Sequence, residues 1–115
     1  MAAGGLPGGT IDFQQMHTYA WQGAYSSTSP LLVTNSQYGL GKPNVIGEFS
    51  QSGGDGRDIT TQFDWAYTQG YSGAWSWQAN ASGENSDNFP NQARGLNSLR
   101  GRNDQSTGGR VDIQL

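Results

Sequence analysis

The sequence contains no cysteine, a single histidine and few charged residues among its 115 positions. Without cysteine, a disulfide framework, a thiolate metal site and a thiol nucleophile are all excluded. One histidine also excludes a zinc site made of several histidines, and we expect no metal or other cofactor. The six Lys and Arg residues are scattered and the net charge is −3, which argues against a nucleic-acid partner and against a polybasic membrane contact.

Long apolar runs are also missing. No stretch approaches the roughly 20 residues of a membrane-spanning helix, so we expect no membrane insertion. Residues 1–10 are rich in glycine and lack the basic and apolar regions of a signal peptide, and they predict a flexible lead-in. The remainder, residues 11–115, has the length of one small domain. The sequence does not fix the compartment.

Glycine is abundant, at 18 residues, and hydrophobic residues make up only 33% of the chain. Aromatic residues nevertheless reach 11% and include four tryptophans, whereas disordered chains are poor in aromatics. We therefore expect a folded chain with glycine-rich connections. A weakly charged composition rich in Gln, Asn, Ser and aromatics also suits a neutral, hydroxyl-rich ligand better than a phosphate.

Three short apolar segments predict β-strands, at residues 11–19, 44–49 and 72–78. Intervals of about 25 residues separate them, which is long enough for a crossover helix. The resulting order, β-α-β-α-β-α, predicts an α/β fold in which three parallel strands are joined by right-handed crossovers.

Proline, glycine and capping residues delimit the connecting helices. Pro30 suits the first turn of a helix and Gly39 its end, which predicts a helix between them. Asp58 is a favourable cap for a second helix, which Gly70 ends. A third helix is predicted over residues 91–100.

One glutamate stands at the end of the second strand. In parallel α/β folds, ligand sites lie at the carboxyl ends of the strands, and Glu48 directly follows an apolar run. A carboxylate in this position, next to Phe49, is a candidate nucleophile or proton carrier. The alternative is a carboxylate that merely points to solvent beyond the strand.

Aromatic and histidine side chains end the two other strands. His17 and Tyr19 have the same parity, so both lie on one strand face, where they can bind a hydroxyl or hold Glu48. Trp75 and Trp77 also share a face, and an indole packs well on the C–H face of a sugar. The alternatives are a core histidine and core tryptophans.

At these positions the sequence resembles a known family. His17-Thr-Tyr19, the segment 42–49 and the segment 70–77 occur in the order found in clan A glycoside hydrolases. They are most similar to the family 5 type of β-mannanases and cellulases. The resemblance covers residues 11–101 and implies strands 6 to 8 of a (β/α)8 barrel, so the expected fold is a partial TIM barrel.

The resemblance also implies a role for each strand end. It makes Glu48 the nucleophile, and His17 and Tyr19 contacts to the sugar or to the nucleophile. It makes Trp77, and less directly Trp75, the aromatic platform that stacks on the sugar ring.

The same resemblance identifies what these 115 residues lack. The family's acid/base glutamate follows strand 4 in an Asn-Glu pair, and the sequence contains no such pair. Retaining hydrolysis needs two carboxyl groups about 5–5.5 Å apart. Asp55 and Glu84, both in glycine-rich loops, are the nearest substitutes, and we assign the role to neither.

We therefore predict a fragment of a retaining endo-β-glycosidase that acts on O-glycosidic bonds of a β-1,4-linked polysaccharide, mannan or cellulose, and is inactive or nearly so alone. Its expected partners are a polysaccharide or oligosaccharide and another chain that supplies the missing barrel strands. Two interpretations remain open beside it. One is a non-catalytic carbohydrate-binding module that self-associates through open strand edges, and the other is a truncated gene product with no role of its own.

Overall fold

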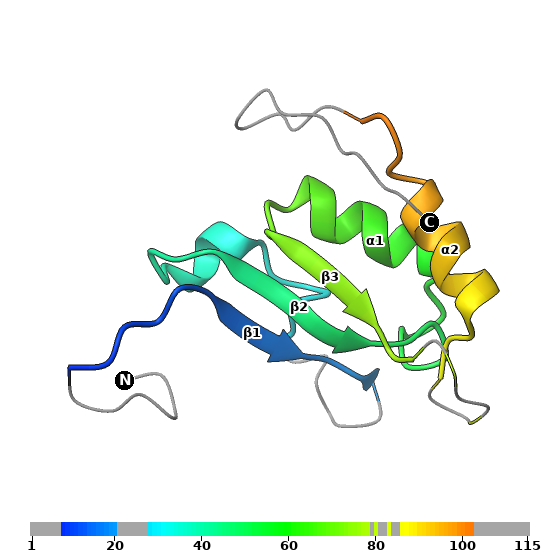
Figure 1. The fold of residues 1–115 in the computed structure, drawn as a ribbon, viewed down its shortest axis with the longest axis horizontal. Helices are drawn as coiled ribbons and strands as arrows, with labels where there is room; N and C mark the ends of the chain where they lie inside the picture. Colours follow the sequence, from blue (N-terminus) through cyan, green and yellow to red (C-terminus); the bar gives the residue numbers. More distant parts are fainter. Residues whose placement is uncertain (1–7, 21–27, 79, 81–82, 84–85, 103–115) are drawn as a thin grey trace.

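The computed structural model describes residues 8–20, 28–78, 80, 83 and 86–102. Three parallel strands lie side by side in the order β1-β2-β3, with helices packed on one side of them (Figure 1). The predicted α/β architecture with parallel strands is thus confirmed. The elements are, in chain order, β1 (Gln14–His17), the 3-10 helix η2 (Asn35–Tyr38), β2 (Asn44–Phe49), α1 (Ile59–Thr68), β3 (Gly73–Ser76) and α2 (Phe89–Asn97).

The apolar core lies between the central strand and the first α-helix. Ile46 and Phe49 of β2 are buried, and so are Ile59 and Phe63 of α1. The rings of Phe49 and Phe63 meet edge to face, with centroids 5.2 Å apart and planes inclined by 71°, a favoured arrangement for two aromatic rings. This packing anchors β2 on its helix side. Glu48 of the same strand instead contacts His17 at the end of β1 and Tyr19 just after it, which together are called the β1 segment.

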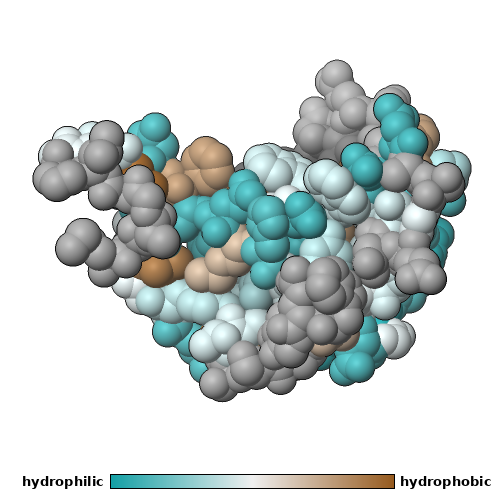
Figure 2. Space-filling view, turned by 90° about the horizontal axis from the view of Figure 1, so that it is seen from below, coloured by the Kyte–Doolittle hydropathy of each residue, from teal (hydrophilic) through white to brown (hydrophobic). Residues whose placement is uncertain are grey.

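Much of the coloured surface in Figure 2 is hydrophilic. Figure 2, which is turned to look from below Figure 1, shows polar residues over much of this face and apolar residues in small separate groups. Exposed apolar side chains such as Ile11 and Phe13 are ordinary on a folded protein. Among the described residues, no helix is both long and apolar enough to cross a membrane.

Helix α1 begins and ends where the sequence predicts. The side chain of Asp58 accepts a hydrogen bond from the backbone N–H of Thr61 at 3.0 Å, which satisfies a free donor of the first turn. Hydrogen bonds from Thr60, Thr61 and Arg94 hold the pKa of this carboxyl well below its ordinary value, so the cap stays charged. Gly70 follows the helix with a φ of +79°, which glycine adopts without strain.

The first connection departs from the predicted helix over residues 30–39. Residues 30–33 form turns, and only the 3-10 helix η2 follows them. Thr34 is extended, with φ −70° and ψ 150°, and its backbone N–H donates to the side-chain oxygen of Gln37 at 2.9 Å. Gly39 ends the element in a left-handed conformation, with φ +61°, at the position expected for a helix end.

The first connection does not form the predicted helix because carbonyls in its turns accept hydrogen bonds from side chains of later elements. The indole N–H of Trp65 donates to the carbonyl of Pro30 at 2.9 Å, and the hydroxyl of Tyr71 donates to the carbonyl of Val33 at 2.6 Å. These two hydrogen bonds hold the connection against α1 and against the segment before β3. Tertiary packing has therefore overridden the local helix signal.

The other differences concern where elements begin and end. Strand β1 covers only the middle of the predicted 11–19, because its pairing begins opposite the first residue of β2, Asn44. Helix α2 begins earlier than the predicted residue 91, because the side chain of Asn88 accepts from the backbone N–H of Asn91 at 3.0 Å and caps the helix there. Strand β3 likewise covers the centre of the predicted 72–78.

The close approach of the two α-helices yields a stability prediction. A Cβ at Gly95 of α2 would collide with the Phe63 ring and lie 2.9 Å from Ile59. We expect Gly95→Ala to lower the free energy of unfolding by about 1–3 kcal/mol through overpacking, measured by urea denaturation. The exposed Asn97→Ala in the same helix is the control and should be nearly neutral. A gain of about 1 kcal/mol in Gly95→Ala, as helix propensity alone predicts, would contradict the close packing.

Candidate active site

An irregularity in β2 turns Glu48 toward the β1 segment. On the β1 side, Met16 pairs with Ile46 but His17 pairs with Glu48, and on the β3 side the register slips between Ile46 and Phe49. One extra residue in a strand reverses the alternation of the side chains that follow. Ile46 and Phe49, three residues apart, can therefore both enter the core, while Glu48 lies opposite His17.

Two side chains approach the Glu48 carboxylate from the β1 segment. The hydroxyl of Tyr19 donates a hydrogen bond to Oε1 at 2.7 Å, and Nδ1 of His17 lies 3.5 Å from Oε2. The side chain of Glu48 is 24% exposed and that of His17 46% exposed. The carboxylate is thus partly shielded from water and held at one oxygen, while the other oxygen faces an imidazole that remains open to solvent.

Tyr19 is buried against the loop that follows β2. A Cβ at Gly53 would lie 2.5 Å from the Tyr19 ring, so only glycine leaves room for the ring in this position. The backbone N–H of Ala20 donates to the carbonyl of Gly53 at 2.9 Å and fixes the two segments together. Burial raises the pKa of the Tyr19 phenol well above its ordinary value of 10.0, with further contributions from the hydrogen bond to Glu48 and the charges of Glu48 and Asp87.

The two tryptophans at the third strand differ in their surroundings. Trp77 donates its backbone N–H to the carbonyl of Phe49 at 2.7 Å, which places it beside the end of β2, and it is 42% exposed. Trp75 is 57% exposed and lines an apolar groove with residues of α1 and α2, including Phe63 and Leu96. The register of β2 and β3 places both backbones near the end of β2, but the Trp75 side chain lines the groove against the helices.

A polar network that the sequence did not reveal joins the loops after β2 and β3. Asp87 is buried, and its carboxylate accepts from the backbone N–H of Gln51 at 3.0 Å and from the side chain of Asn91 at 2.8 Å. The backbone N–H of Asp87 donates to the carbonyl of Trp77 at 2.5 Å. Burial raises the pKa of the Asp87 carboxyl, and the hydrogen bonds from Asn91 and Gln51 act in the opposite direction.

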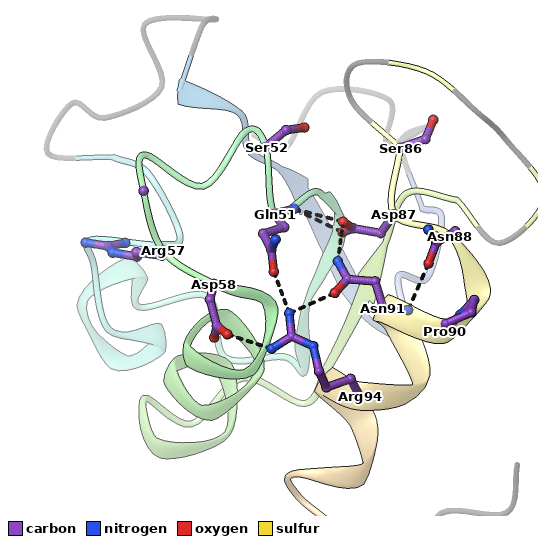
Figure 3. Close-up of a pocket in the computed structure, with 11 residues that line it drawn as sticks. Gln51, Ser52, Arg57, Asp58, Ser86, Asp87, Asn88, Pro90, Asn91 and Arg94 are labelled. Atoms are coloured by element: carbon purple, nitrogen blue, oxygen red, sulfur yellow. Dashed lines mark hydrogen bonds and ion pairs between the residues drawn. The ribbon is translucent and has the colours of Figure 1, made fainter.

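Arg94 extends this network across a polar hollow of about 760 Å³ (Figure 3). Its guanidinium donates to Asp58 at 2.7 Å and to both Gln51 and Asn91 at 2.8 Å. The network therefore braces the loop that follows Glu48 against the loop that follows Trp77. The lining residues are Gln51, Ser52, Gly56, Arg57, Asp58, Ser86, Asp87, Asn88, Pro90, Asn91 and Arg94.

Of the two acidic residues considered as substitutes for the missing acid/base, the structure describes only Asp55. Asp55 is exposed in the loop after β2 and has a left-handed backbone, with φ +53°. Glu84 lies outside the described residues. Within the part of the chain that the structure describes, no group of three His, Cys, Asp or Glu side chains is placed to hold a metal ion.

Buried tyrosines predict how stability changes with pH. Burial also raises the pKa of Tyr71, so above about pH 10 the folded chain keeps phenolic protons that the unfolded chain releases. Stability is then fully present below pH 10 and falls as the pH rises beyond it. We expect Tyr19→Phe to make this alkaline fall shallower, as measured by urea denaturation between pH 8 and 11. An unchanged slope would show that Tyr19 is not the buried phenol described here.

Comparisons with known proteins agree on one family. No protein-family model matches the chain. The chain is 45% identical over 102 aligned positions to mannan endo-1,4-β-mannosidase of Mytilus edulis. It is 40% identical over 116 aligned positions to that of Cryptopygus antarcticus. These matches cover 89% and 98% of this chain but only 26% and 30% of the relatives, so the chain spans less than a third of their length.

Solved structures give the same result. Endo-1,4-β-mannanase from Eisenia fetida matches with a TM-score of 0.82 and 77% identity, over 91% of this chain and 29% of that one. The mannanase from Cryptopygus antarcticus matches with a TM-score of 0.79 and 39% identity, over 89% of this chain and 29% of that one. The expected partial TIM barrel and the resemblance to family 5-type glycoside hydrolases are confirmed, because the chain is similar in sequence and in fold to a segment of the endo-1,4-β-mannanases.

Proposed function

We propose that this chain supplies the nucleophile of a retaining endo-β-1,4-mannanase, and that Glu48 is that nucleophile. The observation that carries the proposal is the Glu48 carboxylate at the end of a parallel strand, held at Oε1 by Tyr19 with Oε2 facing His17. Active sites of (β/α)8 enzymes lie at this end of the strands. The relatives are named as mannan endo-1,4-β-mannosidases, which favours mannan over cellulose as the substrate class.

In the proposed reaction, an oxygen of Glu48 forms a bond to the anomeric carbon while the glycosidic C–O bond breaks. A carboxylic acid from outside these 115 residues protonates the leaving oxygen, and water then replaces Glu48 at the anomeric carbon and gives a proton back to that acid. Tyr19 holds Oε1 throughout, which leaves Oε2 as the attacking oxygen. His17 contacts a sugar hydroxyl or the carboxylate, and Trp77 stacks on the ring, with Trp75 as a more distant aromatic contact.

Hydrolysis by this scheme requires more than the 115 residues. Their only other glutamate is Glu84, and they contain no Asn-Glu pair to act as acid/base. Absence of the general acid costs on the order of 10² to 10⁴ in rate, and the other barrel strands that shape the cleft are missing too. We therefore propose that the segment acts only when the remaining strands complete the barrel, from the same or another chain.

A chimera tests the role of Glu48 directly. Residues 11–101 would replace the matching segment of the Eisenia fetida mannanase, to which this chain is 77% identical. The chimera should release reducing sugar from β-mannan, whereas the isolated chain should not. Glu48→Gln in the chimera should lower kcat by on the order of 10⁴-fold or more, because the change removes the attacking oxygen but keeps the shape.

Glu84→Gln is the matched control, since it makes the same change at the chain's other glutamate. It should leave kcat within a few-fold of the unsubstituted chimera. Comparable losses in both variants, or full activity in Glu48→Gln, would contradict the assignment. Hydrolysis of mannan by the isolated chain would contradict the proposed need for a second carboxylate.

Carbohydrate binding without catalysis is the second candidate function. The exposed Trp75 and Trp77 favour it, since indole faces suit sugar rings. Among the described residues the sheet also has two outer strands, β1 and β3, whose outer edges can pair with another chain or with a second copy. Both features would serve a binding or self-assembling module as well as they serve a barrel segment.

Binding by the isolated chain separates the two functions. A binding module should change its tryptophan fluorescence on addition of mannohexaose, and Glu48→Gln should leave that binding intact. Trp77→Ala should weaken it by roughly 2- to 12-fold, the range expected for one stacking contact. Phe89→Ala, which removes an exposed ring elsewhere, is the control. Absence of any fluorescence change with sugar would reject the binding module.

A further inference from the structure

The single histidine of the chain has a polar neighbour at each ring nitrogen. The side-chain amide nitrogen of Gln15 lies 2.6 Å from Nε2 of His17. An amide nitrogen only donates hydrogen bonds, so Nε2 of His17 must be the acceptor and carry a lone pair. The proton of the neutral ring then lies on Nδ1, because the hydrogen bond at one ring nitrogen decides the state of the other.

The far side of the ring independently requires the same proton position. Nδ1 lies 3.5 Å from Oε2 of Glu48, and a lone pair turned toward a carboxylate would be repelled by it. If the Gln15 amide were reversed, its oxygen would need a proton on Nε2 and would leave that repulsion in place. Both neighbours of His17 therefore favour an Nδ1–H ring that points at Glu48.

Gly47 of β2 makes room for the Gln15 side chain beside His17. Gln15 and His17 project from the same face of β1, two residues apart. A Cβ at Gly47 would overlap Cγ and Cδ of the Gln15 side chain. Glycine at this position leaves the space through which Gln15 reaches the imidazole. Glu48 thus provides the carboxylate that faces His17, and Gly47 beside it provides the room for Gln15, which contacts the other side of the same imidazole.

We propose that Gln15 is a positioning residue that fixes His17 as the Nδ1–H tautomer and so aims a ring N–H at Glu48. Its catalytic meaning rests on the proposed function, but the tautomer itself does not. With Tyr19 at Oε1 and the His17 N–H toward Oε2, both oxygens of Glu48 face a donor. The carboxylate is then held in one orientation before any sugar binds.

Nitrogen NMR of the 115-residue chain measures the tautomer without any sugar or activity. The sequence contains one histidine, so the ring signals need no assignment by mutation. At a pH that keeps the ring neutral, we expect Nδ1 to give the protonated type of resonance and Nε2 the unprotonated type. Gln15→Met keeps the length of the side chain but removes the donor. It should shift the tautomer ratio toward Nε2–H by roughly 2- to 12-fold, the range of one hydrogen bond.

Matched variants separate this effect from a general disturbance of the fold. Gln14→Met makes the same change on the opposite face of β1 and should leave the ratio unchanged. Gly47→Ala displaces Gln15 and should shift the ratio as Gln15→Met does. Gly73→Ala is its control, because a Cβ there meets Val45 at an ordinary distance of 3.6 Å. Circular dichroism confirms that each variant is folded.

Three results would overturn the proposal: an Nε2–H ring in the unsubstituted chain, an unchanged ratio in Gln15→Met, or an equal shift in Gln14→Met. None of them bears on whether Glu48 is the nucleophile, which the chimera decides. A catalytic failure of Glu48 would likewise leave the measured tautomer standing, so the two proposals fail separately.

Discussion

The arrangement of the candidate site depends on one irregularity in strand β2. The extra residue at Gly47-Glu48 lets Ile46 and Phe49 both pack into the core and sends the intervening carboxylate toward the β1 segment. A regular strand would place Glu48 on the same face as Ile46, where a buried charge would need a partner. The hydrogen bond from Tyr19 then fixes the carboxylate in the position that the register creates.

Residues packed around β2 keep Glu48 in this position. On the helix side, Phe63 packs edge to face on Phe49 and anchors the end of β2. At the carboxyl end, Asp87 binds the backbone of Gln51 while its own N–H holds the carbonyl of Trp77. Core packing and the buried Asp87 carboxylate thus fix the end of β2 from two sides. The side chains at this end of the strand therefore keep defined positions.

The sequence predicts an element of this fold correctly where a single local signal dominates. The strand at 44–49, the Asp58 cap and the stop at Gly70 are predicted because apolar runs, caps and glycine act locally. The helix expected after Pro30 is absent, because its carbonyls bond to Trp65 and Tyr71, far along the chain. Gln15 and Asp87 carry no signal of their own, since their importance arises from a register slip and from burial. The roles assigned to Glu48, His17, Tyr19, Trp75 and Trp77 stay predictions.

Trapping the covalent intermediate tests the central claim most directly. The mannanase chimera that contains residues 11–101 would be treated with a 2-deoxy-2-fluoro-mannosyl fluoride, which slows release of the sugar from the nucleophile. Peptide mass spectrometry would then locate the bound sugar. We expect a sugar ester on Glu48, the carboxylate held by Tyr19. A labelled carboxylate elsewhere, in an active chimera with Glu48 unmodified, would contradict it.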